Sequence, residues 1–494
     1  MNFTYQAHYS YKSRYALGLT VRGEGHTQFG DDRKWTVFPS ISGRWNIADE
    51  SWMQWAKPVL SMLSVRPSYG WAGNVPGQEY LMYTEYQRKG TYLGMTAFAP
   101  KGVRLTEMRA SDKREFNIGS DFGFFNDFIT GAFNYYESTT HDQLMSGYKI
   151  PTSTGYSELA YKNTGAVANR GWELNLSTTR IKVFKDFSIN AYFNVGQNFN
   201  EVTEMEESVL KGINGEFDEQ NGSYLGRIQL GNPIGSIYGF RYKGVYRYSY
   251  KNWKKAMAEE AEGRDGSCPI VRDADGNVVF KADGTPKRMV FMYDNETNKP
   301  KYEFNGGDAI YEDINHDGNI NQLDIVYLGN SNPKAQGGFG LTLNYKRFSL
   351  KANFTYRIDV DVVNNARMNV ENMYSNDNQS AAVNWRWRKD GDRTEIPRAL
   401  YNTGYNYLGS DRYVEDASYL RLSYLQASYG FEPELLKKIG LRTLTIYASA
   451  DNLAFWSTYT GLDPDVPATN WGRAHDNSKT PRSRSYTISL NVGF

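Results

Sequence analysis

The clearest signal along the chain is a strict alternation of apolar and polar side chains. Residues 2–11 read NFTYQAHYSY, so an aromatic or apolar side chain occupies every second position. After a polar turn at 12–14, the alternation resumes through residues 15–22. A period of two is that of a β-strand with one apolar and one polar face, and two such strands joined by a short turn predict an antiparallel hairpin.

The same unit recurs along the chain, and we count about fourteen such strands, each clearest over about 8 to 12 residues. Further alternating segments lie at 116–124, 172–177, 187–195, 339–345 and 348–356. The chain is therefore predicted to be all-β and antiparallel. Polar side chains on one face of these strands are expected to point inward and line a hydrated interior: Asn190, Asn194, Thr342, Asn344, Lys351 and Asn353.

The connections between the predicted strands fall into a short and a long class. Short turns such as 12–14 and 346–347 alternate with long connections at 141–168, 200–236, 248–334, 359–417 and 453–483. Outer-membrane β-barrels have short periplasmic turns and long extracellular loops. The pattern predicts one transmembrane β-barrel domain over residues 1–494 with these ranges as extracellular loops. A soluble β-sandwich or propeller gives the same alternation, so periodicity alone leaves both open.

Aromatic content and the last strand favour the barrel. The 38 Tyr outnumber the 25 Phe and 11 Trp, and tyrosine suits the aromatic girdles at the two membrane interfaces. In residues 485–494 one face carries the apolar side chains Tyr486, Ile488, Leu490, Val492 and Phe494. Such an apolar edge strand would be an aggregation hazard in water, whereas lipid accepts it.

Charge and cysteine usage exclude several other classes. The 56 Lys and Arg balance 55 Asp and Glu, which leaves no electrostatic basis for a nucleic-acid partner. Cys268 is the single cysteine, so a disulfide framework or a thiolate zinc site is excluded. The longest apolar run, 289–293, is far shorter than the roughly 18 residues of a transmembrane helix. Residues 1–20 lack the basic start and apolar core of a secretory signal.

Several segments resemble one family, the SusC/RagA-type TonB-dependent outer-membrane transporters of Gram-negative bacteria. The similar segments are VRGEGHTQFGDDRKWTVFPSISGRWNI (21–47), KREFNIGSDFGFFN (113–126), NRGWELNLSTTRI (169–181), GNPIGSIYGFRYKGVY (231–246), YEDINHDGNINQLDIVYLGNSNPK (311–334), SYLRLSYLQASYGFEPELLKKIGL (418–441) and IYASADNLAFWSTYTGLDPDV (446–466). They follow the order of the family and span almost the whole chain.

The resemblance implies a 22-stranded barrel that holds an N-terminal plug in the outer membrane. It also implies a SusD-like surface lipoprotein as lid, energy from the TonB complex, and import of oligosaccharides or peptides. The signal peptide, TonB-contact segment, plug and first strands of the family have no counterpart in this sequence. At about 30 to 35 residues per strand, 494 residues hold about 14 to 16 strands, so we expect the C-terminal part of such a barrel. A non-TonB porin and a secreted soluble β-protein that binds or cleaves glycans are the alternatives.

The sharpest local motif is DINHDGNINQLD at 313–324. Oxygen-bearing side chains fall at the alternate positions and the last position of a calcium loop, and Gly318 falls at its sharp turn. The predicted ligands are Asp313, Asn315, Asp317, Asn319 (through its backbone carbonyl) and Asp324. The motif departs from a helix-loop-helix site because position 12 is Asp and no helix pattern precedes it. The sequence thus predicts a structural Ca²⁺, with an Asx-rich turn without metal as the alternative.

Other loop residues carry weaker signals. Trp385, Trp387, Trp456 and Trp471 fall in predicted loops, where indole rings stack on sugars or, more often, pack locally. Beside them Arg386, Arg388 and Arg393 could recognise acidic groups, although such clusters are usually solvated surface. The five His make no metal-ligand spacing, and no nucleophile elbow or phosphate loop is present. The chain is predicted not to be an enzyme, and its substrate-binding residues stay unassigned.

Overall fold

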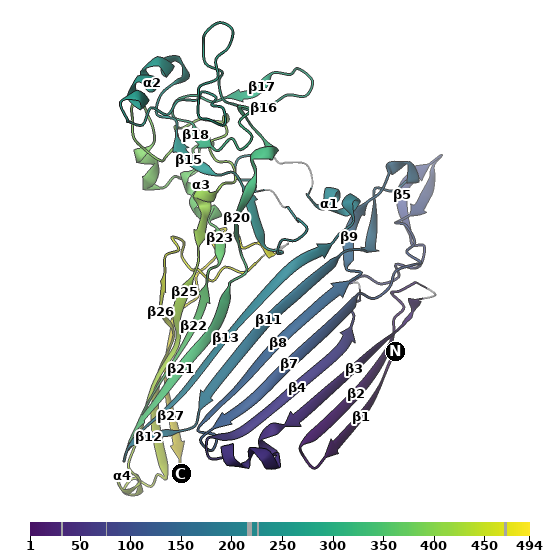
Figure 1. The fold of residues 1–494 in the computed structure, drawn as a ribbon, viewed down its shortest axis with the longest axis vertical. Coiled ribbons are helices and arrows are strands. Elements are labelled where there is room, and N and C mark those ends of the chain that lie inside the picture. The colour runs from purple at the N-terminus through teal and green to yellow at the C-terminus, as the bar shows by residue number, and fades with distance from the viewer. Residues whose placement is uncertain (31–32, 76, 215–219, 225–226, 469–471) are drawn as a thin grey trace.

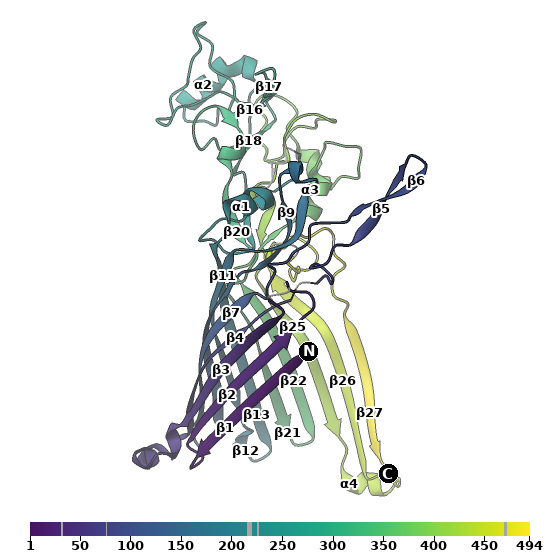
Figure 2. The same ribbon diagram turned by 90° about the vertical axis from the view of Figure 1, so that its right-hand side faces the viewer.

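The computed structural model describes residues 1–494 except 31–32, 76, 215–219, 225–226 and 469–471. A tall antiparallel sheet forms one end of the molecule, and loops with short helices and strands form a separate body at the other end, called the head below (Figure 1). Figure 2 shows the sheet curving round, with its middle strands behind its first strand.

Among the described residues the large sheet has fourteen strands, and thirteen of them follow one another in chain order. They are β1 (Asn2–Tyr11), β2 (Tyr15–Gly25), β3 (Trp35–Asn46), β4 (Leu60–Ala72), β7 (Asp112–Phe124), β8 (Ile129–His141), β11 (Ala166–Thr178), β13 (Phe187–Glu204), β21 (Ala335–Tyr345), β22 (Phe348–Ile358), β25 (Tyr419–Gly430), β26 (Thr443–Ser457) and β27 (Ser485–Gly493). The short β12 (Ile181–Phe184) pairs with β13 beside this path, and β1 and β27 are the two edges. The predicted all-β antiparallel fold is confirmed, and the strand number agrees with the expected 14 to 16.

Strand register places the predicted inward side chains on one face, which we call the lumen face. Asn190 lies opposite Thr342, and Thr342 lies opposite Lys351, so one cross-strand row runs through three strands. Asn194 pairs with Gly338 and Asn353 with Gly340 on the same face.

The opposite face, called the outer face, is apolar. Phe193, Phe339 and Phe354 form a row across β13, β21 and β22, and the last two rings stack with their centroids 4.8 Å apart. Many side chains of this face are exposed, for example Leu341 at 43%. A continuous exposed apolar face is what a barrel presents to lipid.

Short connections lie at the end of the sheet away from the head. At the β1–β2 turn Lys12 and Ser13 both have positive φ (51° and 56°), and the amide of Arg14 donates to the carbonyl of Tyr11 at 3.0 Å. Two successive positive φ values define the hairpin turn whose twist matches the strands. Short helices lie in two of the other connections at this end: η2 (Ile47–Asp49) and η3 (Ser51–Ala56) between β3 and β4, and α4 (Pro433–Lys437) between β25 and β26.

The head is built mainly from two connections, 205–334 between β13 and β21 and 359–418 between β22 and β25. The first contains α1 (Glu207–Asn214), β14 (Ser236–Gly239), β15 (Tyr242–Val245), η5 (Tyr250–Asn252), α2 (Trp253–Ala261), β16 (Val290–Tyr293), β17 (Pro300–Glu303), β18 (Ala309–Tyr311), β19 (Asn319–Ile320), η6 (Gln322–Asp324) and β20 (Val326–Asn330). The second contains β23 (Asp361–Val363), α3 (Asn365–Glu371), η7 (Ala381–Trp385), η8 (Asp411–Tyr413) and β24 (Val414–Asp416).

The sequence-based loop ranges 200–236 and 248–334 therefore lie in one connection. The residues between these two ranges contain β14 and β15. These strands pair with β20 and β18, respectively, so neither β14 nor β15 joins the large sheet. All four residues of β14 are buried, because this strand lies within the packed head.

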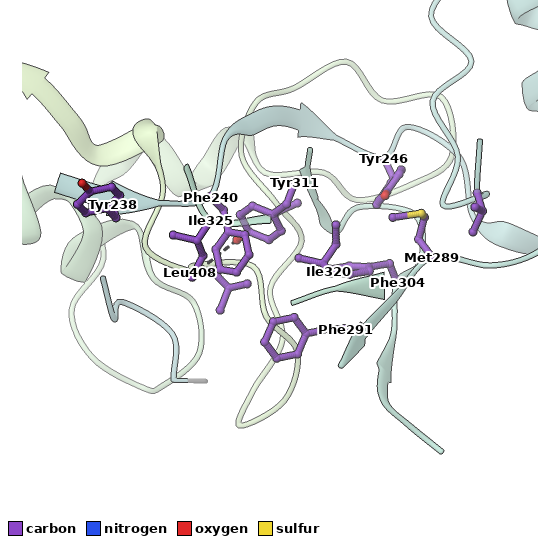
Figure 3. Packing of buried hydrophobic residues seen from close by; sticks show 12 residues of the cluster. Tyr238, Phe240, Tyr246, Met289, Phe291, Phe304, Tyr311, Ile320, Ile325 and Leu408 are labelled. Atoms are coloured by element: carbon purple, nitrogen blue, oxygen red, sulfur yellow. Dashed lines mark hydrogen bonds between the residues drawn. The ribbon is translucent and has the colours of Figure 1, made fainter. Parts of the chain in front are cut away.

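The head has its own hydrophobic core. Phe240, Phe291, Phe304, Ile320 and Leu408 are each at most 1% exposed and pack together (Figure 3). Aromatic and aliphatic side chains from both connections meet here, so the two connections form one packed body and not two independent loops.

Smaller elements surround the rim between sheet and head. They are the hairpin β5 (Tyr86–Tyr92) and β6 (Met95–Pro100), the pair β9 (Leu144–Lys149) and β10 (Glu158–Asn163), and η4 (Thr152–Thr154). Among the described residues no helix combines the length and apolar character needed to cross a membrane.

Candidate functional site

The lumen face carries a shallow polar depression across β11, β13, β21 and β22. Its volume is about 440 Å³, within the roughly 300–1,000 Å³ of typical ligand pockets. Gly196 lies on the lumen face of β13 and leaves room where neighbouring positions carry side chains. The polar side chains around it are Glu173, Asn175, Asn194, Gln336, Thr355, Arg357 and Tyr419. These mixed donors and acceptors suit contact with a polar solute.

Charges on the lumen face are paired across strands. Asp121 on β7 lies 2.7 Å from a guanidinium nitrogen of Arg66 on β4 and 3.3 Å from one of Arg44 on β3. Further along the same face, Arg357 of β22 lies 2.8 Å from Asp465, in the connection between β26 and β27. These pairs keep the interior polar without a large excess of one sign.

The loop 313–324 has the backbone of a calcium-type loop. Asp313 accepts a hydrogen bond from the amide of Gly318 at 2.7 Å, and Asp317 accepts one from the amide of Asn319 at 2.7 Å. Gly318 has a φ of 82°, the left-handed conformation that glycine adopts without strain. Asp324 is fully buried and accepts from the amides of Ile314 and Asn321.

Two buried side-chain oxygens of this loop are without a hydrogen-bond partner among the described residues. They are Oδ1 of Asp313 and Oδ1 of Asn319. A buried unpaired oxygen is costly unless a donor, water or ion meets it. No three His, Cys, Asp or Glu side chains converge on one point among the described residues. A cation here would therefore need asparagine and backbone oxygens to complete its shell.

The predicted tryptophans divide into different environments. Trp387 donates to the carbonyl of Arg247 at 3.1 Å and packs within the head, whereas Trp385 is 78% exposed. Trp456 was expected in a loop but lies in β26 opposite Leu420 on the outer face, as an interfacial girdle residue would. Trp471 lies outside the described residues.

The arginines beside these tryptophans make local contacts. Arg386 donates to the carbonyl of Val383 at 3.2 Å, and Arg388 donates to that of Asn384 at 3.0 Å. Both therefore stabilise the turn at η7, and Arg393 is exposed next to them.

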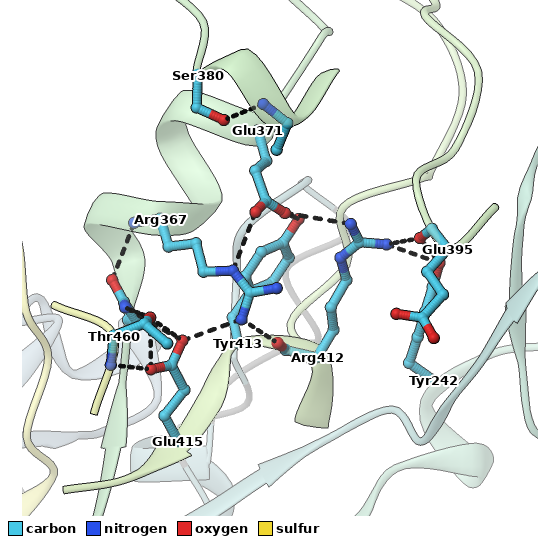
Figure 4. Close-up of polar contacts among 11 residues, drawn as sticks. Tyr242, Arg367, Glu371, Ser380, Glu395, Arg412, Tyr413, Glu415 and Thr460 are labelled. Carbon is cyan, nitrogen blue, oxygen red and sulfur yellow. Dashed lines mark hydrogen bonds and ion pairs between the residues drawn. The ribbon is translucent and has the colours of Figure 1, made fainter. Parts of the chain in front are cut away.

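A polar network that the sequence did not reveal joins the 359–418 connection of the head to Thr460 in the connection between β26 and β27 (Figure 4). Glu371 at the end of α3 is 3.1 Å from Arg412 and 3.0 Å from Arg367. Arg367 also reaches Glu415 of β24 at 3.0 Å, and the backbone amide of Thr460 donates to that carboxylate at 2.9 Å. Burial raises the pKa of Glu415, but the hydrogen bonds from Thr460 and Arg367 outweigh it and hold that pKa below its usual value.

Comparisons with known proteins agree with this architecture. No protein-family model matches the chain. TonB-dependent receptor P39 of Formosa agariphila is 29% identical over 500 residues, covering 98% of this chain and 45% of that protein. TonB-dependent receptor SusC of Bacteroides thetaiotaomicron is 25% identical over 509 residues, covering 98% of this chain and 43% of that protein. The chain thus spans less than half the length of these relatives.

A solved structure shares the fold. The structure of the RagAB peptide transporter superimposes with a TM-score of 0.75 at 22% identity, covering 100% of this chain and 47% of that one. The sheet and its polar and apolar faces thus define the wall of an outer-membrane β-barrel. The predicted resemblance to SusC/RagA-type TonB-dependent transporters and the predicted outer-membrane location are confirmed. The relatives are named receptors and transporters, which agrees with the prediction that the chain is not an enzyme.

Proposed function

We propose that this chain forms part of the barrel wall and the extracellular head of a transporter that imports nutrients across the outer membrane. Its ligands are oligosaccharides or peptides, a SusD-like surface lipoprotein covers its outer opening, and the TonB complex supplies the energy. The observation that carries the proposal is the similarity to TonB-dependent receptors over 98% of the chain. Similarity to the receptor named SusC supports oligosaccharides as ligands, and similarity to the RagAB peptide transporter supports peptides.

The lumen face supports passage of a polar solute. Amide, hydroxyl and paired charged groups line it, as in the rows through Asn190, Thr342 and Lys351 and through Asn194 and Gly338. Hydrogen bonds to such groups replace those a sugar or peptide loses to water, and no single strong contact holds the solute in place.

Deletion of the gene in its own bacterium tests the proposal. We expect loss of growth on at least one oligosaccharide or peptide mixture while growth on the free monosaccharides and amino acids is unchanged. Inactivation of TonB should give the same loss, and a lipoprotein should copurify with the transporter. Uptake that persists without TonB would favour a porin, and recovery of the protein without detergent would favour a soluble glycan-binding protein.

We also propose that the loop 313–324 holds one structural Ca²⁺. Asp313, Asn315, Asp317 and Asp324 would contribute side-chain oxygens, and Asn319 its backbone carbonyl. The unpaired buried oxygen of Asp313 supports this assignment. The loop packs directly on the head core, because the amide of Val290 donates to the carbonyl of Gly318 at 3.0 Å and Ile320 is 1% exposed. A bound ion would therefore stabilise the head.

A further inference from the structure

A second cavity lies in the head, away from the lumen face. Its volume is about 540 Å³, and it lies between the 205–334 and 359–418 connections. The side chains that matter for its chemistry are Tyr302, Asn372, Tyr374, Asn402, Thr403 and Tyr405. Its size falls in the range of small-molecule sites.

Two aromatic rings that contact the head core line this cavity, and both are held in place. The hydroxyl of Tyr302 donates to Asp308 at 2.8 Å and accepts from Arg398 at 3.0 Å. Tyr405 stacks on Phe291 with ring centroids 3.9 Å apart. Because Asp308 and Phe291 are both fully buried, these rings do not need to be ordered when a ligand binds.

The backbone around the cavity is equally fixed. The side-chain amide of Asn221 donates to the carbonyl of Gly404 at 3.1 Å and accepts from the amide of Tyr407 at 3.0 Å, which joins the two connections. The amide of Asn402 donates to the carbonyl of Tyr374 at 2.9 Å. A cavity built on such cross-links is largely formed before a ligand arrives.

Polar groups of the lining are available to a ligand. Asn402 and Thr403 are exposed and Tyr374 is partly exposed, so the side-chain amide of Asn402 and the hydroxyls of Thr403 and Tyr374 are accessible from the cavity. Asn372 is oriented by the bond that its oxygen accepts from the amide of Tyr374 at 2.8 Å. These groups both donate and accept, and no carboxylate is among the described residues of the lining.

We infer that this cavity in the head binds a segment of an oligosaccharide. Sugar hydroxyls both donate and accept, so they match amide and hydroxyl groups, while the apolar ring faces pack against tyrosine. Lys301 is the only charged side chain among the described residues of the lining. The inference rests on the proposed import function and adds a capture site outside the barrel interior.

Binding to the intact transporter, purified in detergent, tests the inference. We expect saturable binding, by calorimetry or saturation-transfer NMR, of at least one member of a panel of malto-, cello-, xylo-, manno- and galacto-oligosaccharides. Asn402→Gly, Thr403→Ala and Tyr374→Phe should each weaken that binding by about 2- to 10-fold, the equivalent of one neutral hydrogen bond. Glycine suits position 402 because Asn402 has a φ of 50°.

Asn378→Ala is the matched control, because Asn378 is exposed in the same connection but does not line the cavity. Hydrogen exchange of the head should be unchanged in all four variants. Absence of binding to every sugar in the panel overturns the inference, as do variants that keep the affinity of the control. If the protein binds a casein peptide digest and none of the sugars, the assignment of an oligosaccharide as the ligand is wrong. If gene deletion abolishes import but the three variants bind sugar as tightly as wild type, the cavity is not the binding site and the proposed function stands. If the protein binds sugar but its deletion changes no import, the proposed function is wrong.

Discussion

The carboxylate of Glu371 lies 3.1 Å from the guanidinium of Arg412, and the two side chains are only 8% and 7% exposed. Arg412 lies beside Tyr413, whose hydroxyl also donates to Glu371 at 3.3 Å. This pair joins α3 to η8 within a buried layer of the 359–418 connection (Figure 4).

Glu371→Gln should destabilise this layer strongly. Removal of one partner leaves a buried guanidinium without its counter-charge, which typically costs about 3–5 kcal/mol. We expect faster hydrogen exchange across 359–417. Glu207→Gln is the control, because its pair with Lys211 is 81% and 75% exposed and contributes at most about 1 kcal/mol. Equal exchange in the two variants would contradict the structural role of the pair.

Adjacent positions on β21 should respond oppositely to lysine. Leu341 lies on the outer face and Thr342 on the lumen face. A lysine in contact with the middle of the bilayer costs about 2–4 kcal/mol, whereas one in the hydrated interior costs little. Leu341→Lys should therefore lower the urea midpoint and the yield of folded protein, measured by heat-modifiable gel mobility. Thr342→Lys should leave both near wild type, and a reversed order would refute the assignment of the two faces.

Acidification should loosen the connection between β26 and β27 through His475. Burial, followed by the charge of Arg473, lowers the pKa of His475 to about 4, below its ordinary value of 6.5. Between these values the unfolded segment binds more protons than the folded one, so stability is complete above about pH 6.5 and falls as the pH drops toward 4. Limited proteolysis near 475 should speed up from pH 7 to pH 5. His475→Gln should remove most of that change, and an unaltered pH profile would exclude His475 as its source.

Calcium should stabilise the head through the loop 313–324. We expect EGTA to lower the melting temperature of the wild-type protein and added Ca²⁺ to restore it. Asp313→Asn should abolish the response, because it removes the charge of the first ligand position. Asp294→Asn serves as control, since Asp294 accepts hydrogen bonds in an unrelated turn of the head, from the amide of Thr297 among others. A wild-type protein whose melting ignores both additives would favour the metal-free turn.

The sequence was sufficient to predict the sheet because strand periodicity is a local property. Asn190, Thr342 and Lys351 alternate with apolar neighbours, so their common face followed before any pairing was known. A shift of one residue in the pairing of a strand would turn its polar side chains to the outer face and its apolar ones to the lumen, so the alternation strongly restricts the register.

The head could not be predicted in the same way. Its strands have at most five residues, too few for a sustained alternation, and β14 is buried on both sides. Glu371 and Arg412 are neighbours only after two distant parts of one connection fold together, and no spacing in the sequence marks them. The predicted end of β26 was also wrong. Trp456 was expected in the loop 453–483, but β26 continues to Ser457.

The pairing of β14 with β20 also bears on the order of assembly. Strands β13 and β21 are direct neighbours, although residues 205–334 separate them. The entropy lost on closing such a connection grows with its length. When β14 and β20 pair first, Ser236 and Asn330 are already adjacent, and only the linkers 205–235 and 331–334 remain to be closed. We therefore expect β14 and β20 to pair before β13 and β21 do, so that the first part of the head shortens the connection that barrel assembly must close.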